Sequence, residues 1–541
     1  MISQKTKSAK NPLFKGVFST LRHEKGFLSE ASFFTMVEHT GLEPVTSSLP
    51  AIRAPSCANA PRLLRVHLLY IDMNYLSRRN IRTITGLVFV LTLFKCYNSS
   101  QLKENYHMDK NLAWELLNEI SFVRVAGTKE ELRAANILKR EAEKLGAETV
   151  IEDFEIEGAS ISEAVLEVLE PEYCSYPVIG IGKTKSTKKE GVIGDFKYIE
   201  NAKDANLTDI KGKIVLVQGR TMPDLMKKLV EKGALGYVAI GGDFYEEDSI
   251  KHELRPTNAF GKDVNIPGLK IHIDDAEKLV RSKPQKVRLV LRTRKTKGTS
   301  HNVVATIEGT DLKDEVIAFS AHYDSVPYSK GSWDNGTGSV TVMELLRYFS
   351  QNRPRRTMKF IWCGSEEIGL VGSRKYCEAH KDELGKYIFN INFDMTGVTI
   401  GYEFVCCSCS EDTLHTIEYL ANIENYPLSS ELGMYSSDSS SFAAAGVPAC
   451  TFARLQTRGG AQIHNHHDNM DHLDPDSFMI TLNFVARFAD QIANASVNPI
   501  PRKFADKVTK LMEERKKWLG GADKKEEKPK KADKPLEKKT K

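Results

Sequence analysis

The pattern of apolar and polar positions becomes regular from Met108 onward and predicts helices first. A helix is expected over 112–120, and a second one begins at Thr128, where Glu131 three residues later completes a capping box. Gly146 is expected to end the second helix, and the alternation over 149–156 predicts a strand. These elements form a first segment, 108–156, of the main domain.

Residues 157–297 contain short apolar runs that are typical of a small, β-rich insert domain. The predicted strands are 192–193, 214–217, 236–240 and 287–291, with one helix over 222–232. The runs Asp209–Val217 and Glu231–Val238 resemble the protease-associated domain, which is inserted into several peptidases. A generic β-rich insert is the alternative.

Residues 298–498 alternate predicted strands with helices of 10–15 residues, the pattern of an α/β domain with a mainly parallel mixed sheet flanked by helices. The strands are 302–307, 316–321, 358–363, 387–393, 403–407 and 449–453, and the helices are 338–349, 373–380, 412–423 and 475–495. A terminal helix is expected over 499–519. The Lys-, Glu- and Pro-rich residues 520–541 are expected to be disordered.

Residues 1–107 show no sustained period, so we expect a non-native or disordered extension there. The apolar run 86–94 is too short to span a bilayer, so stable membrane insertion is not expected. The nine cysteines lie mostly in apolar runs, which indicates free thiols and a reducing, cytoplasmic compartment. The segment 73–96 mimics a signal peptide, however, so export is the alternative.

The charge of the chain is divided by position. Residues 108–514 carry a net charge of −10, whereas residues 1–107 carry +8 and residues 515–541 carry +7. An acidic body argues against a nucleic-acid-binding core. It suits cationic ligands such as metal ions or free amines.

The side chains that carry chemistry occur where the predicted strands of 298–498 end. They are His322, Asp324, Asp334, Glu366, Glu367, Asp394 and His464. Ligands of open α/β sheets gather at the carboxyl ends of strands, so these distant segments are expected to converge on one pocket. The two imidazoles and three of these carboxylates, brought together in such a pocket, suit a pair of divalent ions.

The spacing also indicates supporting roles within this pocket. Asp324 lies two residues after His322 and is placed to hold the imidazole tautomer, and we count it among the catalytic residues. Asp468, four residues after His464, is expected to do the same for that ring. Two adjacent carboxylates, Glu366 and Glu367, can divide the work of proton acceptor and ligand.

Five motifs carry a resemblance to a known family: His322-x-Asp, Asp334-Asn-Gly-x-Gly, Glu366-Glu, Asp394-Met-Thr and His464-x-x-x-Asp. In this order and spacing they resemble the dizinc exopeptidases that include leucyl aminopeptidases, aminopeptidase Y and glutamate carboxypeptidase. The resemblance covers about Met108 to Asn494.

The resemblance implies a role for each of these residues. Asp334 would bridge two ions, normally Zn²⁺ with Co²⁺ or Mn²⁺ possible, and Glu366 would be the general base. The remaining ligands would be His322 and Asp394 for one ion, and Glu367 and His464 for the other. A cis peptide bond between Asp334 and Asn335 is also implied, with Asn335 supporting the ligands.

The substrate pocket is less well marked. Many members of the family have Ser-Asp-His late in the domain, whereas this chain has Ser437-Asp438-Ser439. We assign Asp438 and Arg454 to substrate binding, the latter for a substrate carboxylate.

The expected function is an aminopeptidase that acts on peptides. A carboxypeptidase of the same family is the first alternative, and a one-zinc acyltransferase resembling glutaminyl cyclase is another. A metal-free peptide-binding or receptor-like protein belongs to a different class. The sequence leaves the oligomeric state open.

Overall fold

The computed structural model describes residues 109–218, 223–244, 246–259, 264–457 and 460–518. The expected N-terminal extension, the signal-like segment 73–96 and the Lys-rich tail lie outside these residues. Within the described ranges no helix has the length and apolarity needed to cross a membrane.

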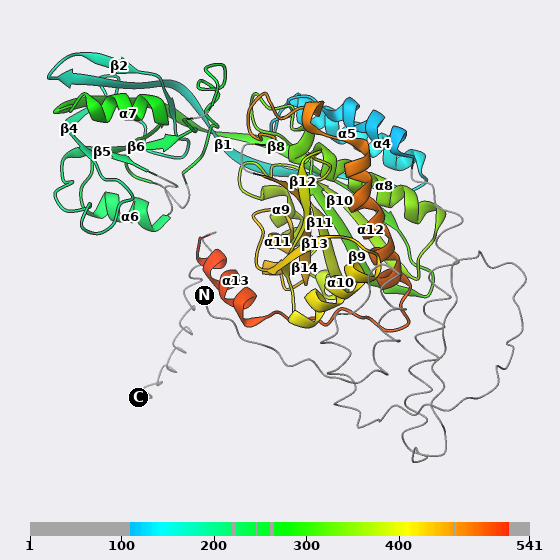
Figure 1. Cartoon of the computed structure of the whole chain (residues 1–541). Coiled ribbons are helices and arrows are strands. Elements are labelled where there is room, and N and C mark those ends of the chain that lie inside the picture. The colour runs from blue at the N-terminus through cyan, green and yellow to red at the C-terminus, as the bar shows by residue number, and fades with distance from the viewer. Residues whose placement is uncertain (1–108, 219–222, 245, 260–263, 458–459, 519–541) are drawn as a thin grey trace, which may run out of the picture. The chain divides into compact units, whose positions relative to one another are not determined.

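The main domain is built on a mixed sheet in the order β13-β12-β14-β11-β9-β10-β8 (Figure 1). The strands are β8 (Lys286–Ile307), β9 (Leu312–His322), β10 (Arg356–Cys363), β11 (Tyr387–Phe393), β12 (Gly401–Ser408), β13 (Leu428–Leu432) and β14 (Ala449–Gln456). Strand β9 is parallel to β10 and β11, β11 to β14, and β12 to β13. Among these seven strands, only the β8–β10 and β12–β14 pairs are antiparallel. The expected mainly parallel mixed sheet is confirmed.

Helices cover both faces of this sheet (Figure 1). One face carries α4 (Lys110–Ile120), α5 (Lys129–Lys144), α8 (Thr337–Gln351), α10 (Glu411–Ile423) and α12 (Pro475–Asn494). The other carries α9 (Val371–Ala379) and α11 (Ser439–Ala444), and α13 (Asp506–Trp518) packs against α11. Short helical turns are η1 (Ser332–Gly336), η2 (Leu384–Lys386) and η3 (Met470–His472). The stacked, fully buried rings of Phe319, Phe360 and Phe393 form the centre of the first interface.

The inserted residues continue the same sheet in the order β8-β4-β5-β6-β7-β3. The elements are β1 (Glu148–Glu170), β2 (Cys174–Tyr176), β3 (Val178–Gly180), β4 (Val192–Tyr198), β5 (Lys213–Val217), α6 (Pro223–Glu231), β6 (Gly236–Gly241), β7 (Gly268–His272) and α7 (Ile273–Arg281). The core of α6 lies on one face of these strands and that of α7 on the other. The insert is therefore a small α/β unit that contains more helix than the sequence indicated.

The boundaries expected for the insert fall inside two long strands. Strands β1 and β8 are antiparallel partners from Glu148↔Thr306 to Glu170↔Lys286, with register shifts at two points. The predicted boundaries lie at Ile156↔Gly298 and Glu157↔Lys297, which face each other in this ladder. Because the hydrogen bonds continue across both points, the two parts are joined by a ribbon rather than by loops.

Sequence reasoning missed several short elements: β2, β3, β7 and α7 in the insert, and β13 and α11 in the main domain. Helix α11 has six residues, three of them serine, too few to show a helical period. Strand β13 alternates between half-buried and exposed positions at the edge of the sheet, so it has no apolar run. The apolar face of α7 spans only nine residues.

The predicted capping box at α5 is present in a modified form. Thr128 Oγ1 accepts the Glu131 N–H at 3.3 Å, but the Glu131 carboxylate turns to the N–H of Gly127 at 3.0 Å. The same buried carboxylate accepts from Ser300 Oγ at 2.7 Å and Tyr323 Oη at 2.7 Å. Glu131 thus ties the start of α5 to β8 and to the residue that follows β9.

We predict that Glu131→Ala lowers the free energy of unfolding by about 2–4 kcal/mol, because several buried donors lose their acceptor. Urea unfolding followed by circular dichroism measures the change. The matched control is Glu130→Ala, whose ion pair with Lys129 spans 3.7 Å at the surface and should contribute less than about 1 kcal/mol. Equal losses in the two variants would contradict this role.

Candidate active site

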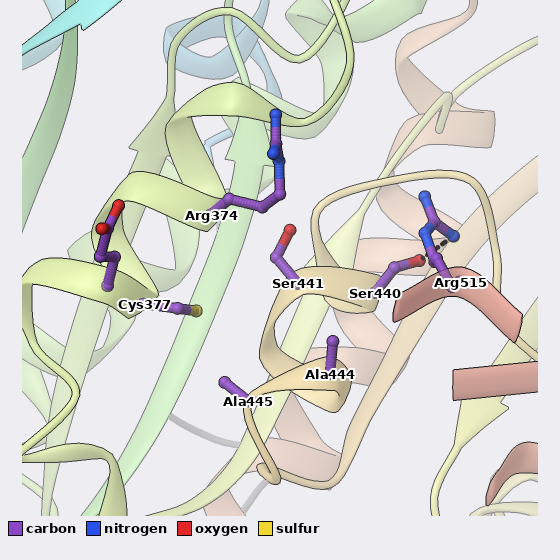
Figure 2. A pocket seen from close by; sticks show the side chains of 8 residues that line it. Arg374, Cys377, Ser440, Ser441, Ala444, Ala445 and Arg515 are labelled. Atoms are coloured by element: carbon purple, nitrogen blue, oxygen red, sulfur yellow. Dashed lines mark hydrogen bonds between the residues drawn. The ribbon is translucent and has the colours of Figure 1, made fainter. Parts of the chain in front are cut away.

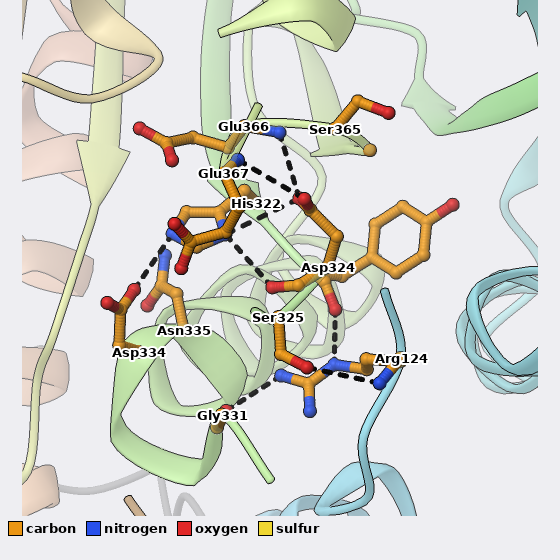
Figure 3. A network of polar contacts seen from close by, with 12 residues as sticks. Arg124, His322, Asp324, Ser325, Gly331, Asp334, Asn335, Ser365, Glu366 and Glu367 are labelled. Atoms are coloured by element: carbon orange, nitrogen blue, oxygen red, sulfur yellow. Dashed lines mark hydrogen bonds and ion pairs between the residues drawn. The ribbon is translucent and has the colours of Figure 1, made fainter. Parts of the chain in front are cut away.

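The parallel strands bring the predicted site residues to one edge of the sheet. His322 is the last residue of β9, Glu366 and Glu367 lie in the turn after β10, and Asp394 follows β11 directly. Asp334 lies in η1, between β9 and α8. Figure 3 shows Asp334, Glu366 and Glu367 around the His322 ring. The convergence expected from the strand ends is therefore observed.

Asp334 lies between two imidazole rings and uses one oxygen for each. Its Oδ1 is 3.1 Å from His322 Nε2, and its Oδ2 is 3.0 Å from His464 Nε2. Asp394 Oδ1 approaches the first ring at 3.7 Å, and Glu367 Oε1 approaches the second at 3.4 Å. Two groups of potential ligands thus share Asp334, and the atoms of each lie within 4.8 Å of one another.

The donor atoms of this site fit divalent cations. Two carboxylate oxygens, Glu367 Oε1 and Asp394 Oδ1, are buried without a hydrogen-bond partner among the described residues. Buried carboxylate oxygens without donors are costly, and a cation satisfies them. Imidazole nitrogen combined with carboxylate oxygen is a donor set that suits Zn²⁺, and Mn²⁺ or Co²⁺ also accept it.

The concentration of carboxylates shifts the protonation of the whole group. Burial raises the pKa of Asp394, and the charge of Asp334 adds to that effect. Burial would also raise the pKa of Asp334, but hydrogen bonds with His322 and His464 outweigh it and hold the pKa well below its usual range. Burial lowers the pKa of His464, yet the carboxylates of Asp334 and Glu367 beside its ring raise it to about 9.

Glu366 differs from its neighbour in direction and in environment. Figure 3 shows its carboxylate turned away from that of Glu367. Burial raises the pKa of Glu366 well above its ordinary value; His322 opposes this, and the carboxylates of Glu367, Asp438 and Asp394 add to the increase. A carboxylate with a raised pKa accepts a proton more readily near neutral pH, which is the property a general base needs.

Asp324 positions both glutamates through their backbone. Its carboxylate oxygens accept the N–H of Glu366 at 2.9 Å and the N–H of Glu367 at 3.2 Å (Figure 3). His322 Nδ1 lies 3.2 Å from the backbone oxygen of Asp324 and 3.6 Å from its carboxylate. The backbone oxygen thus has the role that we predicted for the carboxylate, which instead holds the Glu366 turn.

Comparison with known proteins identifies the family of this region. Residues 302–489 match the sequence pattern of peptidase family M28. Residues 302–489 belong to that family. The match includes every predicted ligand and Glu366.

The similar proteins include both an aminopeptidase and a carboxypeptidase. Aminopeptidase YwaD of Bacillus subtilis is 28% identical over 290 residues, which cover 52% of this chain and 60% of that protein. Carboxypeptidase Q of Rattus norvegicus is 25% identical over 375 residues, covering 65% of this chain and 78% of that protein.

The fold is also found among solved structures. A zinc aminopeptidase from Bacillus subtilis, BSAP, superposes with a TM-score of 0.62 at 23% identity and covers 74% of this chain and 100% of that one. An aminopeptidase from Aneurinibacillus sp. strain AM-1 gives a TM-score of 0.61 at 22% identity, covering 73% and 96%. The α/β fold with a central mixed sheet is therefore shared with these proteins.

Two further predicted features of the M28 domain have clear places. The Asn335 amide donates to Phe393 O at 2.8 Å and its Oδ1 accepts Met395 N–H at 3.2 Å, so it connects the Asp334 turn to the residues flanking Asp394. The peptide bond between Asp334 and Asn335 is cis, as the family resemblance implied.

Asp468 does not hold the His464 ring, so that prediction is wrong. Its carboxylate accepts Trp333 N–H at 2.8 Å and Ser329 Oγ at 3.1 Å, and thereby fixes the turn that precedes Asp334. The four-residue spacing is insufficient because the chain turns at His464, whose φ is +67°. Burial, with the nearby charge of Asp334, raises the pKa of Asp468 to about 7.

The two residues assigned to substrate binding have different outcomes. Arg454 donates to Glu403 Oε1 at 2.8 Å and to Val398 O at 2.7 Å, so its guanidinium is not available for a substrate and the prediction is wrong. Asp438 is fully buried, and neither of its oxygens has a hydrogen-bond partner among the described residues. Burial raises the pKa of Asp438 to about 6.

The insert contributes side chains that sequence reasoning missed. Arg255 donates to Glu367 O at 2.8 Å, contacts the Glu367 carboxylate, and lies 3.3 Å from His464 Nδ1. Glu253 accepts the His466 N–H at 3.0 Å. No sequence signal marks Arg255, which lies 112 residues from Glu367 in the chain.

We predict that Asp324→Asn lowers kcat of peptide hydrolysis about 10–100-fold, because the amide nitrogen repels one of the two N–H groups that the carboxylate accepts. Steady-state kinetics measure the loss, and metal analysis should find the parent metal content. Asp314→Asn is the control, since Asp314 pairs with Lys386 on the surface at 3.0 Å. A parent-like kcat in Asp324→Asn would show that the Glu366 turn needs no such support.

Proposed function

We propose that this protein is a dizinc exopeptidase that removes N-terminal residues from peptides. The observation that carries the proposal is the position of Asp334, whose two oxygens each face a histidine of a different ligand group. Family membership and the named relatives support peptide hydrolysis. BSAP, which shares the fold, is a zinc aminopeptidase, and this supports zinc over Co²⁺ or Mn²⁺.

The ligand groups assign each residue to an ion. His322, Asp334 and Asp394 would hold one ion, and Asp334, Glu367 and His464 the other. Bound there, the ions would supply Lewis acidity and lower the pKa of a water molecule. Glu366 accepts the proton of that water and returns it to the leaving amine. Asp324 keeps Glu366 in place during both transfers.

The preference for the amino end of a substrate rests on the carboxyl group that the ions would leave unneutralised. Two divalent ions would balance the charges of Asp334, Glu366, Glu367 and Asp394, and Asp438 adds a further buried carboxyl beside them that would attract a free ammonium group. The Arg255 guanidinium beside Glu367 does not favour the carboxypeptidase alternative, because the Glu367 backbone oxygen and carboxylate and the His464 ring already engage it. A one-zinc acyltransferase and a metal-free receptor are less well supported, because both ligand groups and Glu366 are complete.

Three further expectations remain proposals. We assign the insert to the protease-associated type on its 209–217 and 231–238 runs, which form β5 and lead into β6. A reducing, cytoplasmic location is supported by the seven described cysteines, all free and six of them buried. The acidic body of the chain supports the absence of nucleic-acid partners.

We predict stepwise loss of N-terminal residues when residues 108–541, loaded with zinc, digest short free peptides. N-acetylated peptides should stay intact, and mass spectrometry identifies the shortened end. Glu366→Gln should keep its metal and lose on the order of 10²–10⁴-fold in kcat, because no group accepts the proton of the attacking water. Loss from the carboxyl end would favour the carboxypeptidase, and near-parent activity of Glu366→Gln would remove that residue from the mechanism.

We predict that Asp334→Ala abolishes the binding of two ions, since both groups lose their shared ligand and the charge that offsets two neighbouring cations. Inductively coupled plasma mass spectrometry of the dialysed protein measures the ratio of zinc to chain. The parent and Asp382→Ala, a change at an exposed aspartate, should each retain two ions. Two ions in Asp334→Ala would refute the bridge.

A further inference from the structure

A pocket next to the active-site turn contains two arginines that have no carboxylate partner among the residues the structure describes. It is a cavity of about 270 Å³ between α9, α11 and α13. Arg374 comes from α9 and Arg515 from α13, and Ser440 and Ser441 come from α11. Figure 2 shows the Ser441 hydroxyl on the wall between the two guanidinium groups.

The hydrogen bonds of the two guanidiniums leave their charges uncompensated. Arg374 donates only to backbone oxygens, at 3.2 Å to Leu370 and 3.1 Å to Gly369. Arg515 Nη1 donates to Ser440 Oγ at 2.8 Å (Figure 2). The one carboxylate that lines the pocket, Glu378, is bound by Lys375 at 2.8 Å. The described walls of the pocket therefore carry an excess of positive charge.

The two charges also act on each other. Burial lowers the pKa of Arg515, and the charge of Arg374 lowers it further. Burial likewise lowers the pKa of Arg374. Two like charges that are partly withdrawn from water are stabilised by an anion placed between them. Hydroxyl groups such as that of Ser441 add donors for the same anion.

The pocket is joined to the catalytic turn by short structural links. Helix α9 begins four residues after Glu367, and α11 follows Asp438 directly. Ser373 Oγ donates to Ser441 Oγ at 2.9 Å and so connects the two helices. The negative charge of Glu366 is close enough to raise the pKa of Arg515 against the effect of burial.

We propose that Arg374 and Arg515 bind a carboxylate of the peptide substrate and so select acidic substrates. The proposal rests on the proposed peptidase function. A planar guanidinium pairs with a carboxylate through two parallel hydrogen bonds, and two such groups facing one cavity favour that ligand over a neutral side chain. The carboxylate is either that of an aspartate or glutamate side chain or the terminal carboxylate of a short peptide.

Two pairs of peptides distinguish a side-chain carboxylate from the terminal carboxylate. Glu-Ala-Ala-amide against Gln-Ala-Ala-amide tests the side-chain carboxylate, and Ala-Ala-Ala against its amide tests the terminal one. In the parent protein, the charged peptide of at least one pair should have a KM roughly tenfold or more below that of its neutral partner. A difference of this size is what a charge-assisted hydrogen bond contributes. Arg374→Met and Arg515→Met should each remove most of that difference while kcat for the neutral peptides stays near the parent value.

Matched variants separate a specific contact from a general loss of charge. Lys510→Met removes a positive charge from an exposed position of α13 and should keep the discrimination. Arg515→Lys should restore part of it, because one charge returns without the planar fork. If either methionine variant unfolds, Arg515→Lys and competitive inhibition of the parent by glutarate still test the pocket.

A binding measurement keeps failure of this proposal apart from failure of the proposed function. Calorimetric titration of each peptide into Glu366→Gln needs no turnover. Equal Kd values within both pairs would overturn the carboxylate pocket even if the parent is a peptidase. The same holds if the arginine variants weaken the binding of all peptides equally. Discrimination in binding without hydrolysis by the parent would retain the pocket and reject the peptidase.

Discussion

The active site depends on one buried carboxylate, Asp334, held between the imidazoles of His322 and His464. Charges inside a protein are costly unless they are paired, and here several carboxylates share a small volume. The histidines offset part of that charge, and two oxygens remain for a cation to satisfy. The same excess of negative charge that makes the site costly to fold suits divalent cations.

The surrounding fold holds these charges at fixed positions through backbone contacts. Asp324 binds two backbone N–H groups of the Glu366 turn, and Asp468 binds the backbone before Asp334. The buried guanidinium of Arg124 donates to the backbone oxygen of Ile120 at 2.9 Å. It also donates to the backbone oxygen of Gly331 at 2.7 Å (Figure 3). Groups that hold the backbone in place also orient the ligand side chains, and they do so without competing for the metal.

The insert contributes side chains that contact the active site. The long ladder of β1 and β8 carries the chain from the main sheet into the insert and back. From there Arg255 reaches Glu367, and Glu253 reaches the loop after His464. On another side, the C-terminal helix α13 supplies Arg515 to the pocket beside α9. Segments outside the 302–489 match therefore supply cationic groups beside an acidic centre.

The sequence by itself determined most strands and helices of the main domain, although not β13 and α11, and the resemblance of its five motifs indicated the residues of the two ligand groups. Apolar periodicity records which face of an element is buried, and parallel strands place their carboxyl ends at one edge, so these elements and the meeting of their strand ends could be inferred without coordinates. Only the tertiary structure decided where hydrogen bonds and charges meet. Asp468 contacts Trp333, Arg454 contacts Glu403 and Arg255 contacts Glu367. These contacts depend on the path of loops whose sequences have no hydrophobic periodicity. The insert boundary and the pocket of Arg374 and Arg515 likewise arise from segments that are far apart in the chain and adjacent in space.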